Sequence, residues 1–201
     1  MNSSTPKTLP GLLKRNASFF GDTKVALREK EFGIWQSVSW QAYYDKVRYL
    51  SLGLVELGYK AEDKLSVIGD NRPEWLYSEL AIQALGGAVV GIFPDSHLEQ
   101  VQYIIDHSDS VFVLVEDQEQ TDKILNMIDR IPRVRKVIID DMKGMRNYDH
   151  PKLIPFSKVL EVGRERDRRD PSLFDSRLDR VKEEDTAMIL YTSGTTGLPK
   201  G

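Results

Sequence analysis

The residues best suited to chemistry gather at the end of the chain, in YTSGTTGLPKG from Tyr191 to Gly201. The glycines of this segment allow backbone N–H groups to turn toward an anion without a Cβ in the way. Its hydroxyls add hydrogen-bond donors, and its lysine adds a positive charge. The combination predicts a phosphate-binding loop, to which we expect these residues to contribute: Thr192, Ser193, Gly194, Thr195, Thr196, Gly197 and Lys200.

The spacing is not that of the GxxxxGK[ST] phosphate loop. Pro199 stands where that motif needs its second glycine, and Gly201 rather than serine or threonine follows Lys200. From composition alone, a flexible surface turn explains the segment equally well. Its position favours a ligand, because it directly follows the apolar run 186–192 (TAMILYT), which is predicted to be a buried strand. Open α/β sheets bind ligands at the carboxyl ends of such strands.

The composition limits the class of protein. With 201 residues, 40% hydrophobic and 29% charged, the chain can build a core as one globular domain, with two domains as the alternative. The net charge of −3 provides no electrostatic argument for nucleic-acid binding. The absence of cysteine excludes disulfides, thiolate metal sites and a cysteine nucleophile. Metal-ligand spacing is also missing among the histidines, which are His97, His107 and His150.

The chain shows no targeting or membrane-spanning pattern. Its start, MNSSTPKTLPGLLKRN, has no basic stretch followed by an apolar region. Its least polar run, 81–93, is interrupted by Gln83 and a glycine pair, and falls short of the roughly 20 apolar residues that a span needs. We therefore expect a cytoplasmic protein, with peripheral membrane contact left open.

The elements that must position the tail follow from periodicity. Helical patterns cover 9–20, after the capping residue Thr8, and 40–57, after the capping residue Ser39, and a β-hairpin turns at 31–33 between them. Apolar strands then alternate with amphipathic helices, the strands lying at 64–70, 88–93, 111–116, 136–140 and 186–192. This alternation predicts an α/β fold with a mostly parallel sheet, helices on both faces, and the hairpin outside it.

Local details carry weaker expectations. We expect Asn71 to cap a helix through 85, Ser96 to open a capping box, and a helix at 119–131 to stop at Pro132. The stretch 140–185 breaks the rhythm, and its charged run GRERDRRD is expected to be a solvated helix face or loop. Asp140 and Asp141 have no partner carboxylate at a defined distance, so no acid–base pair is predicted.

Two segments together resemble a known family. YTSGTTGLPKG closely resembles the phosphate-loop signature of the adenylate-forming superfamily, which contains acyl-CoA synthetases, firefly-type luciferases and peptide-synthetase adenylation domains. Residues 38–96 are similar to the N-terminal part of bacterial long-chain fatty-acid–CoA ligases. The resemblance runs from about residue 9 to 201 and is weakest over 140–185. Asp95 departs from it, because many members carry threonine there.

The resemblance implies a reaction in two steps. A carboxylate attacks the α-phosphate of ATP and releases pyrophosphate, and the thiol of CoA then displaces AMP from the acyl-adenylate. The loop would hold the β- and γ-phosphates, with Lys200 in a supporting role, because the catalytic lysine of the family lies in a C-terminal domain absent from this sequence. No catalytic residue is expected in 1–201, and the Mg²⁺ ligand is expected downstream.

Residues 1–201 are accordingly expected to be a partial AMP-binding domain, cut just after its phosphate loop and inactive alone. Fatty acid, ATP and CoA would be partners of the longer enzyme. Two alternatives remain. One is an aryl-CoA ligase or adenylation domain of the same superfamily. The other is a non-catalytic α/β module whose tail is only a linker. The reading frame after Gly201 would separate the module from the ligase.

Overall fold

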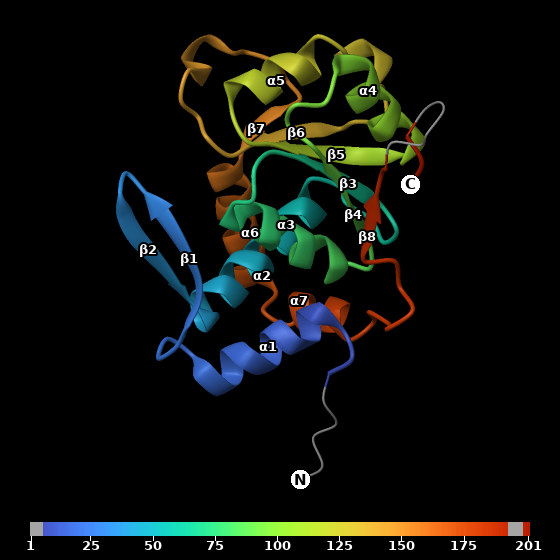
Figure 1. Ribbon diagram of the computed structural model, residues 1–201. Helices are drawn as coiled ribbons and strands as arrows, with labels where there is room; N and C mark the ends of the chain where they lie inside the picture. The colour runs from blue at the N-terminus through green and yellow to red at the C-terminus, as the bar shows by residue number, and fades with distance from the viewer. Residues whose placement is uncertain (1–5, 193–198) are drawn as a thin grey trace.

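The structure, a computed structural model, describes residues 6–192 and 199–201. Its centre is a six-stranded sheet made of β3 (Lys64–Ile68), β4 (Ala88–Ile92), β5 (Ser110–Val115), β6 (Lys136–Ile139), β7 (Leu153–Pro155) and β8 (Met188–Leu190). The strand order is β7-β6-β5-β3-β4-β8, and every neighbouring pair is parallel. The predicted parallel α/β fold is therefore confirmed (Figure 1).

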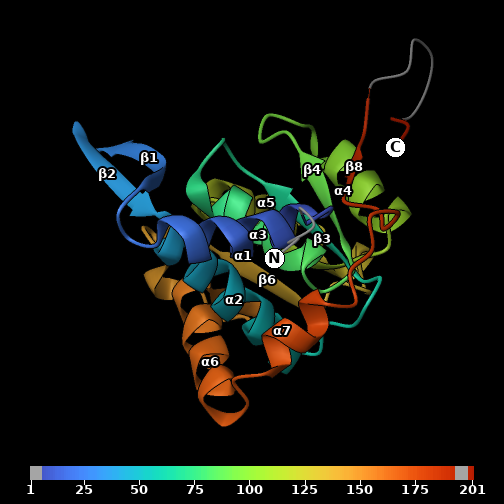
Figure 2. The same cartoon turned by 90° about the horizontal axis from the view of Figure 1, so that it is seen from below.

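Helices cover both faces of the sheet, as expected. On one face lie α1 (Leu9–Phe20), α2 (Trp40–Glu56), α3 (Pro73–Gln83), α6 (Phe156–Arg169) and α7 (Leu173–Leu178), which Figure 2 shows in front of the sheet. On the other lie α4 (Leu98–His107) and α5 (Gln118–Leu125). Strand β5 feeds both cores, because Phe112 and Leu114 face the first group of helices while Val113 and Val115 face the second.

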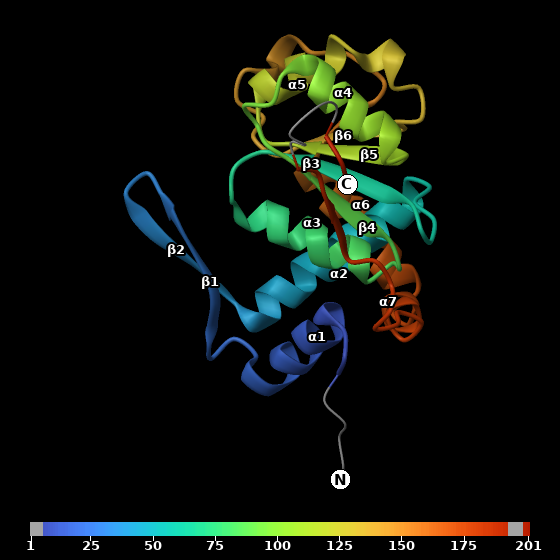
Figure 3. The ribbon, with the colours of Figure 1, turned by 45° about the vertical axis from the view of Figure 1, so that its right-hand side comes forward.

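The hairpin of β1 (Val25–Glu31) and β2 (Ile34–Ser39) forms a separate antiparallel pair outside the main sheet. It projects from the helical body in two views (Figures 1 and 3). Its turn residues Phe32 and Gly33 have φ of 46° and 81°, the left-handed geometry that suits a two-residue hairpin turn. The last residue of β2, Ser39, caps α2 by accepting a hydrogen bond from the N–H of Ala42 at 3.0 Å.

The segment 140–185, which had no clear pattern, supplies β7, α6 and α7 and a 3₁₀ turn at Met145–Asn147. Helix α6 packs along α2 through glycines: a Cβ on Gly163 would overlap the carbonyl of Tyr49, and one on Gly53 would overlap that of Val159. The charged run is the second half of α6. Only part of it is solvated, because Arg166 and Arg169 each pair with Glu56 of α2 at 3.0 Å.

Two expected helix caps are wrong. The residue that caps α3 is Arg72, not Asn71, and α3 has no side-chain cap because the arginine side chain carries only hydrogen-bond donors. Helix α4 starts after His97, so Ser96 lies one residue too early for its side chain to reach the helix N–H groups. The helix expected over 119–131 ends at Leu125 and continues only as a 3₁₀ turn, Ile128–Arg130, before Pro132.

Within the described residues, no helix has the length and apolar character that a membrane span requires.

Candidate functional site at the carboxyl edge of the sheet

Parallel strands bring their carboxyl ends to one edge of a sheet, and here that edge collects the predicted site. Strand β8 pairs with β4 in the register Gly91↔Leu190, so Tyr191 and Thr192 leave the sheet beside the end of β4. Strand β4 in turn pairs with β3. The chain after β3 continues through Asn71 toward α3 at the same edge. The tail therefore leaves from a strand end, as predicted. The buried strand expected over 186–192 is wrong, because β8 covers only Met188–Leu190 and lies at the edge of the sheet, where its residues are half-buried or exposed.

The two ends of the predicted phosphate segment lie together. The N–H of Thr192 donates to the carbonyl of Lys200 at 2.9 Å, and the N–H of Lys200 donates back to Thr192 at 3.1 Å. The structure therefore brings together the first and last of the predicted residues. The others lie outside the described residues, and their predicted roles stay predictions: Ser193, Gly194, Thr195, Thr196 and Gly197.

Tyr191 stands at the base of this pair and joins it to α4. Its hydroxyl lies 2.7 Å from Nδ1 of His107, and that imidazole stacks on Tyr103 with ring centroids 5.1 Å apart. The Tyr191 ring also lies against the backbone of Gly201. Burial is the main cause that raises the pKa of Tyr191. From the sequence, His107 has no role beyond its lack of metal-ligand spacing, and no local pattern indicates its contact with Tyr191.

An apolar cavity of about 270 Å³ lies beside Tyr191. Its lining includes the apolar side chains of Trp75, Ile92, Phe93 and Leu190 together with Asn71 and Thr192. Gly91 also lines it: a Cβ at this position would lie 3.3 Å from both Leu190 and Trp75. Asn71, expected to be a helix cap, therefore has a different position, at a cavity next to the predicted phosphate segment.

A charged cluster centred on Arg72 occupies the same edge further along. The guanidinium of Arg72 pairs with three carboxylates from different elements, at 3.4, 3.4 and 3.7 Å respectively: Glu29 of the hairpin, Glu116 after β5 and Asp140 after β6. These pairs tie the hairpin to the sheet. The sequence offered no sign of the cluster, because its members are far apart along the chain.

The cluster contains more carboxylates than arginines, and the pKa values of two of its carboxyl groups are raised. Burial, and next the carboxylate of Glu74, raise the pKa of Asp140 to about 7, although Arg72 opposes them. Burial also raises the pKa of Glu74, whose Oε2 is buried with no hydrogen-bond partner among the described residues. Asp140 thus has carboxylate neighbours after all, although nothing here places it against a reacting atom.

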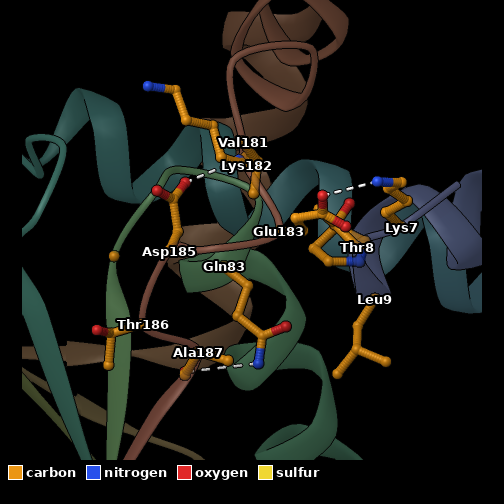
Figure 4. A pocket seen from close by; sticks show the side chains of 12 residues that line it. Lys7, Thr8, Leu9, Gln83, Val181, Lys182, Glu183, Asp185, Thr186 and Ala187 are labelled. Atoms are coloured by element: carbon orange, nitrogen blue, oxygen red, sulfur yellow. Dashed lines mark hydrogen bonds and ion pairs between the residues drawn. The ribbon is translucent and has the colours of Figure 1, made fainter.

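A second cavity, of about 170 Å³, lies at the opposite edge, where the chain enters β8 (Figure 4). Lys7 and Glu183, which pair at 2.7 Å, lie on its lining with Gln83, whose side-chain amide donates to the carbonyl of Ala187 at 3.5 Å. These contacts tie the start of α1 and the end of α3 to the approach of β8. Neither Thr192 nor Lys200 lines this cavity.

An open parallel sheet that presents a glycine- and hydroxyl-rich segment at its carboxyl edge has the architecture of α/β enzymes that bind nucleotides. Residues 13–201 match the family model described as AMP-binding enzyme, and the chain belongs to that family.

Curated relatives with similar sequences are long-chain-fatty-acid–CoA ligases. ACSBG2 of Xenopus laevis is 29% identical over 205 residues, covering 99% of this chain and 26% of the relative. ACSBG2 of Homo sapiens is 31% identical over 98% of this chain and 29% of the relative. FadD15 of Mycobacterium bovis is 30% identical over 84% of this chain and 26% of the relative. The chain thus spans under a third of the length of these relatives.

Solved structures with a similar fold include a CoA ligase and a CoA synthetase. The anthranilate CoA ligase AuaEII superposes with a TM-score of 0.74 at 19% identity, covering 94% of this chain and 33% of that one. Acetoacetyl-CoA synthetase from Streptomyces lividans superposes with a TM-score of 0.72 at 21% identity, covering 93% of this chain and 28% of that one. At these identities the likeness supports the fold and not the substrate.

Proposed function

We propose that this chain is the N-terminal part of an ATP-dependent, AMP-forming fatty-acid–CoA ligase. The observation that carries the proposal is the pairing of Thr192 with Lys200, which closes the two ends of the predicted phosphate segment at the carboxyl edge of the sheet. The apolar cavity beside Tyr191 supports an acid with an alkyl chain as the substrate. The relatives, which are long-chain-fatty-acid–CoA ligases, support the same class.

In the proposed first step, a carboxylate oxygen attacks the α-phosphorus of ATP and the bond to the β-phosphate breaks. The products are acyl-adenylate and pyrophosphate. In the second step, the thiol of CoA attacks the acyl carbon, AMP leaves, and the thiol proton passes to solvent. Negative charge grows on pyrophosphate in the first step, so donors already in place around it lower the barrier.

The segment is proposed to provide those donors. Hydroxyls of Thr192, Ser193, Thr195 and Thr196 and the backbone N–H groups near Gly194 and Gly197 would hold the β- and γ-phosphates, and Lys200 would add charge. Mg²⁺ would neutralise the phosphates further. Among the described residues no group of His, Cys, Asp or Glu is placed to hold a metal, so the ligand for Mg²⁺ is not assigned to them.

The location and domain assignments are also proposals. We propose that residues 1–201 form part of one AMP-binding domain and that the protein works in the cytoplasm, where the absence of cysteine would fit reducing conditions. A peripheral contact with a membrane would give access to fatty acids and is compatible with this location.

The proposal is tested with the protein translated from the complete reading frame. ATP–pyrophosphate exchange is measured with palmitate, octanoate, benzoate and anthranilate, and acyl-CoA formation is measured after CoA is added. We expect exchange to depend on a fatty acid. Exchange with an aromatic acid alone would instead favour the alternative of an aryl-CoA ligase. A folded protein with no exchange for any acid would favour the non-catalytic module.

A further inference from the structure

Tyr191 lies next to both ends of the phosphate segment, through its bond to Thr192 and its ring against Gly201. It precedes Thr192 directly, and Thr192 is paired through its backbone with Lys200 in both directions. Its ring lies against Gly201, where an added Cβ would come within 2.7 Å of Cζ. A contact that fixes the Tyr191 side chain therefore also restrains the backbone pair of Thr192 and Lys200, where the two ends of the segment meet.

What fixes the Tyr191 side chain is the last turn of α4. His107 Nδ1 lies 2.7 Å from the Tyr191 hydroxyl, and the two rings meet edge to face at a centroid distance of 5.8 Å. Tyr103, one turn earlier, stacks on His107 at 5.1 Å and meets Tyr191 edge to face at 6.4 Å. Three rings thus form one contact between α4 and the chain that follows β8.

This contact adds little to the stability of the fold. Its main effect is to orient the side chains of His107 and Tyr191. His107 is exposed, and Tyr103 and Tyr191 are only half-buried. The apolar side of α4 is instead held in the core by Val101, Ile104 and Ile105. A hydrogen bond on the surface contributes little net stability, but it does select one orientation of the two side chains.

We propose that His107 is a positioning residue for the phosphate-binding segment. By holding the Tyr191 hydroxyl, it sets the direction in which Thr192 and Lys200 present their side chains to a polyphosphate. This inference rests on the proposed function, since it gives the pair a role in binding ATP. A misplacement of about 1 Å in such a site can cost on the order of 100-fold in rate.

Three variants separate the hydrogen bond from the ring packing. His107→Phe keeps a ring against Tyr103 and removes the hydrogen bond, and Tyr191→Phe removes the same bond from the other side. His107→Asn removes the ring but places an amide near the position of Nδ1, where it can still bond to the hydroxyl. His97→Phe, at the opposite end of the same helix, is the matched control, because His97 makes no capping hydrogen bond with its side chain.

The first measurement is the steady-state kinetics of the complete translated protein with ATP and palmitate. We expect His107→Phe and Tyr191→Phe each to lower kcat/KM for ATP by about 5- to 50-fold, below the roughly 100-fold limit for misplacement. The KM for palmitate should stay within about twofold, the double variant should be no worse than either single one, and His107→Asn should recover most of the loss. Unchanged kinetics in both Phe variants, or additive losses, would overturn the proposal.

The second measurement needs no activity and separates this inference from the proposed function. Hydrogen exchange of the Thr192 and Lys200 amides is measured in the 201-residue chain. We expect exchange about 5- to 10-fold faster in His107→Phe, the size of effect that one net hydrogen bond gives, and unchanged exchange in His97→Phe. If exchange speeds up while the parent enzyme forms no adenylate, His107 does position the segment and only the proposed function is wrong. If exchange is unchanged, His107 does not position the segment.

Discussion

At the scale of single residues, Asp140 is the carboxyl group at the carboxyl edge of the sheet whose pKa is shifted strongly. Its pKa is raised to about 7 by burial and by Glu74, against about 3.9 in an unfolded chain. The folded state therefore binds this proton more tightly than the unfolded state. The resulting stability is fully present below about pH 4 and is lost as the pH rises through about 7.

Asp140→Asn should flatten this pH dependence, because the amide stays neutral. Above about pH 7 we expect the variant to be more stable than the parent, by on the order of 1 kcal/mol after solvent screening, and the difference should shrink toward about pH 4. Urea unfolding at several pH values measures this. Asp149→Asn, at an exposed carboxylate outside this cluster, is the control. Parallel pH curves for the parent and Asp140→Asn would contradict the assignment.

Residue contacts were the least predictable level from sequence. The pairs Tyr191–His107 and Arg72–Asp140 join positions 84 and 68 residues apart, as their numbers show, and no local pattern marks them. The phosphate segment was predictable because glycines, hydroxyls and a lysine act within a few consecutive residues. The caps at Asn71 and Ser96 were predicted wrongly because residue type alone does not set the residue at which a helix starts.

At the scale of elements, the close contact of α2 and α6 depends on two glycines. Gly163→Ala should destabilise the protein by roughly 1–3 kcal/mol, because the new methyl would overlap the carbonyl of Tyr49 and force the helices apart. The result is a sharp test, since alanine is favoured over glycine in an isolated helix by about 1 kcal/mol. Thermal and urea unfolding provide the measurement.

The control for this prediction is Glu165→Ala, on the exposed side of the same helix. A surface substitution of this kind should change stability by less than about 0.5 kcal/mol. If Gly163→Ala were as stable as the control, α6 would not pack against α2 as closely as described.

The floor of the apolar cavity provides a second prediction for elements. Gly91→Val places an isopropyl group between Leu190 and Trp75, where a Cβ alone would already lie 3.3 Å from each of these side chains. If the cavity holds the alkyl chain, adenylation of palmitate should fall about 10- to 200-fold relative to that of acetate, the discrimination that a hydrophobic pocket can reach. Rates for the two acids with the complete translated protein measure the ratio. An equal loss for both acids would mean that the cavity holds something else.

Strands were predictable because fully buried parallel strands are continuous apolar runs, such as KLSVI and SVFVLV. Helix α6 was not, because only Phe156, Val159, Leu160 and Gly163 of its residues are buried and the rest are mostly charged. Its glycine contacts a backbone rather than a side chain, and a hydrophobic pattern contains no signal for such a contact.

At the scale of the whole molecule, the parallel sheet separates two cores and leaves one edge for ligands. The helices of the first face hold β8 and the hairpin in place, while α4 reaches from the second face to the base of the phosphate segment (Figures 1 and 3). The central claim of the proposed function is that this segment binds the polyphosphate of ATP.

The most direct test replaces Thr195 and Thr196 together with alanine in the complete translated protein. ATP–pyrophosphate exchange and thermal stability are measured side by side. If the hydroxyls hold the phosphates in the transition state, exchange should slow by about 10- to 1000-fold per lost interaction, while the melting temperature barely changes. Unchanged exchange, or a large loss of stability with the rate per folded molecule intact, would contradict the account.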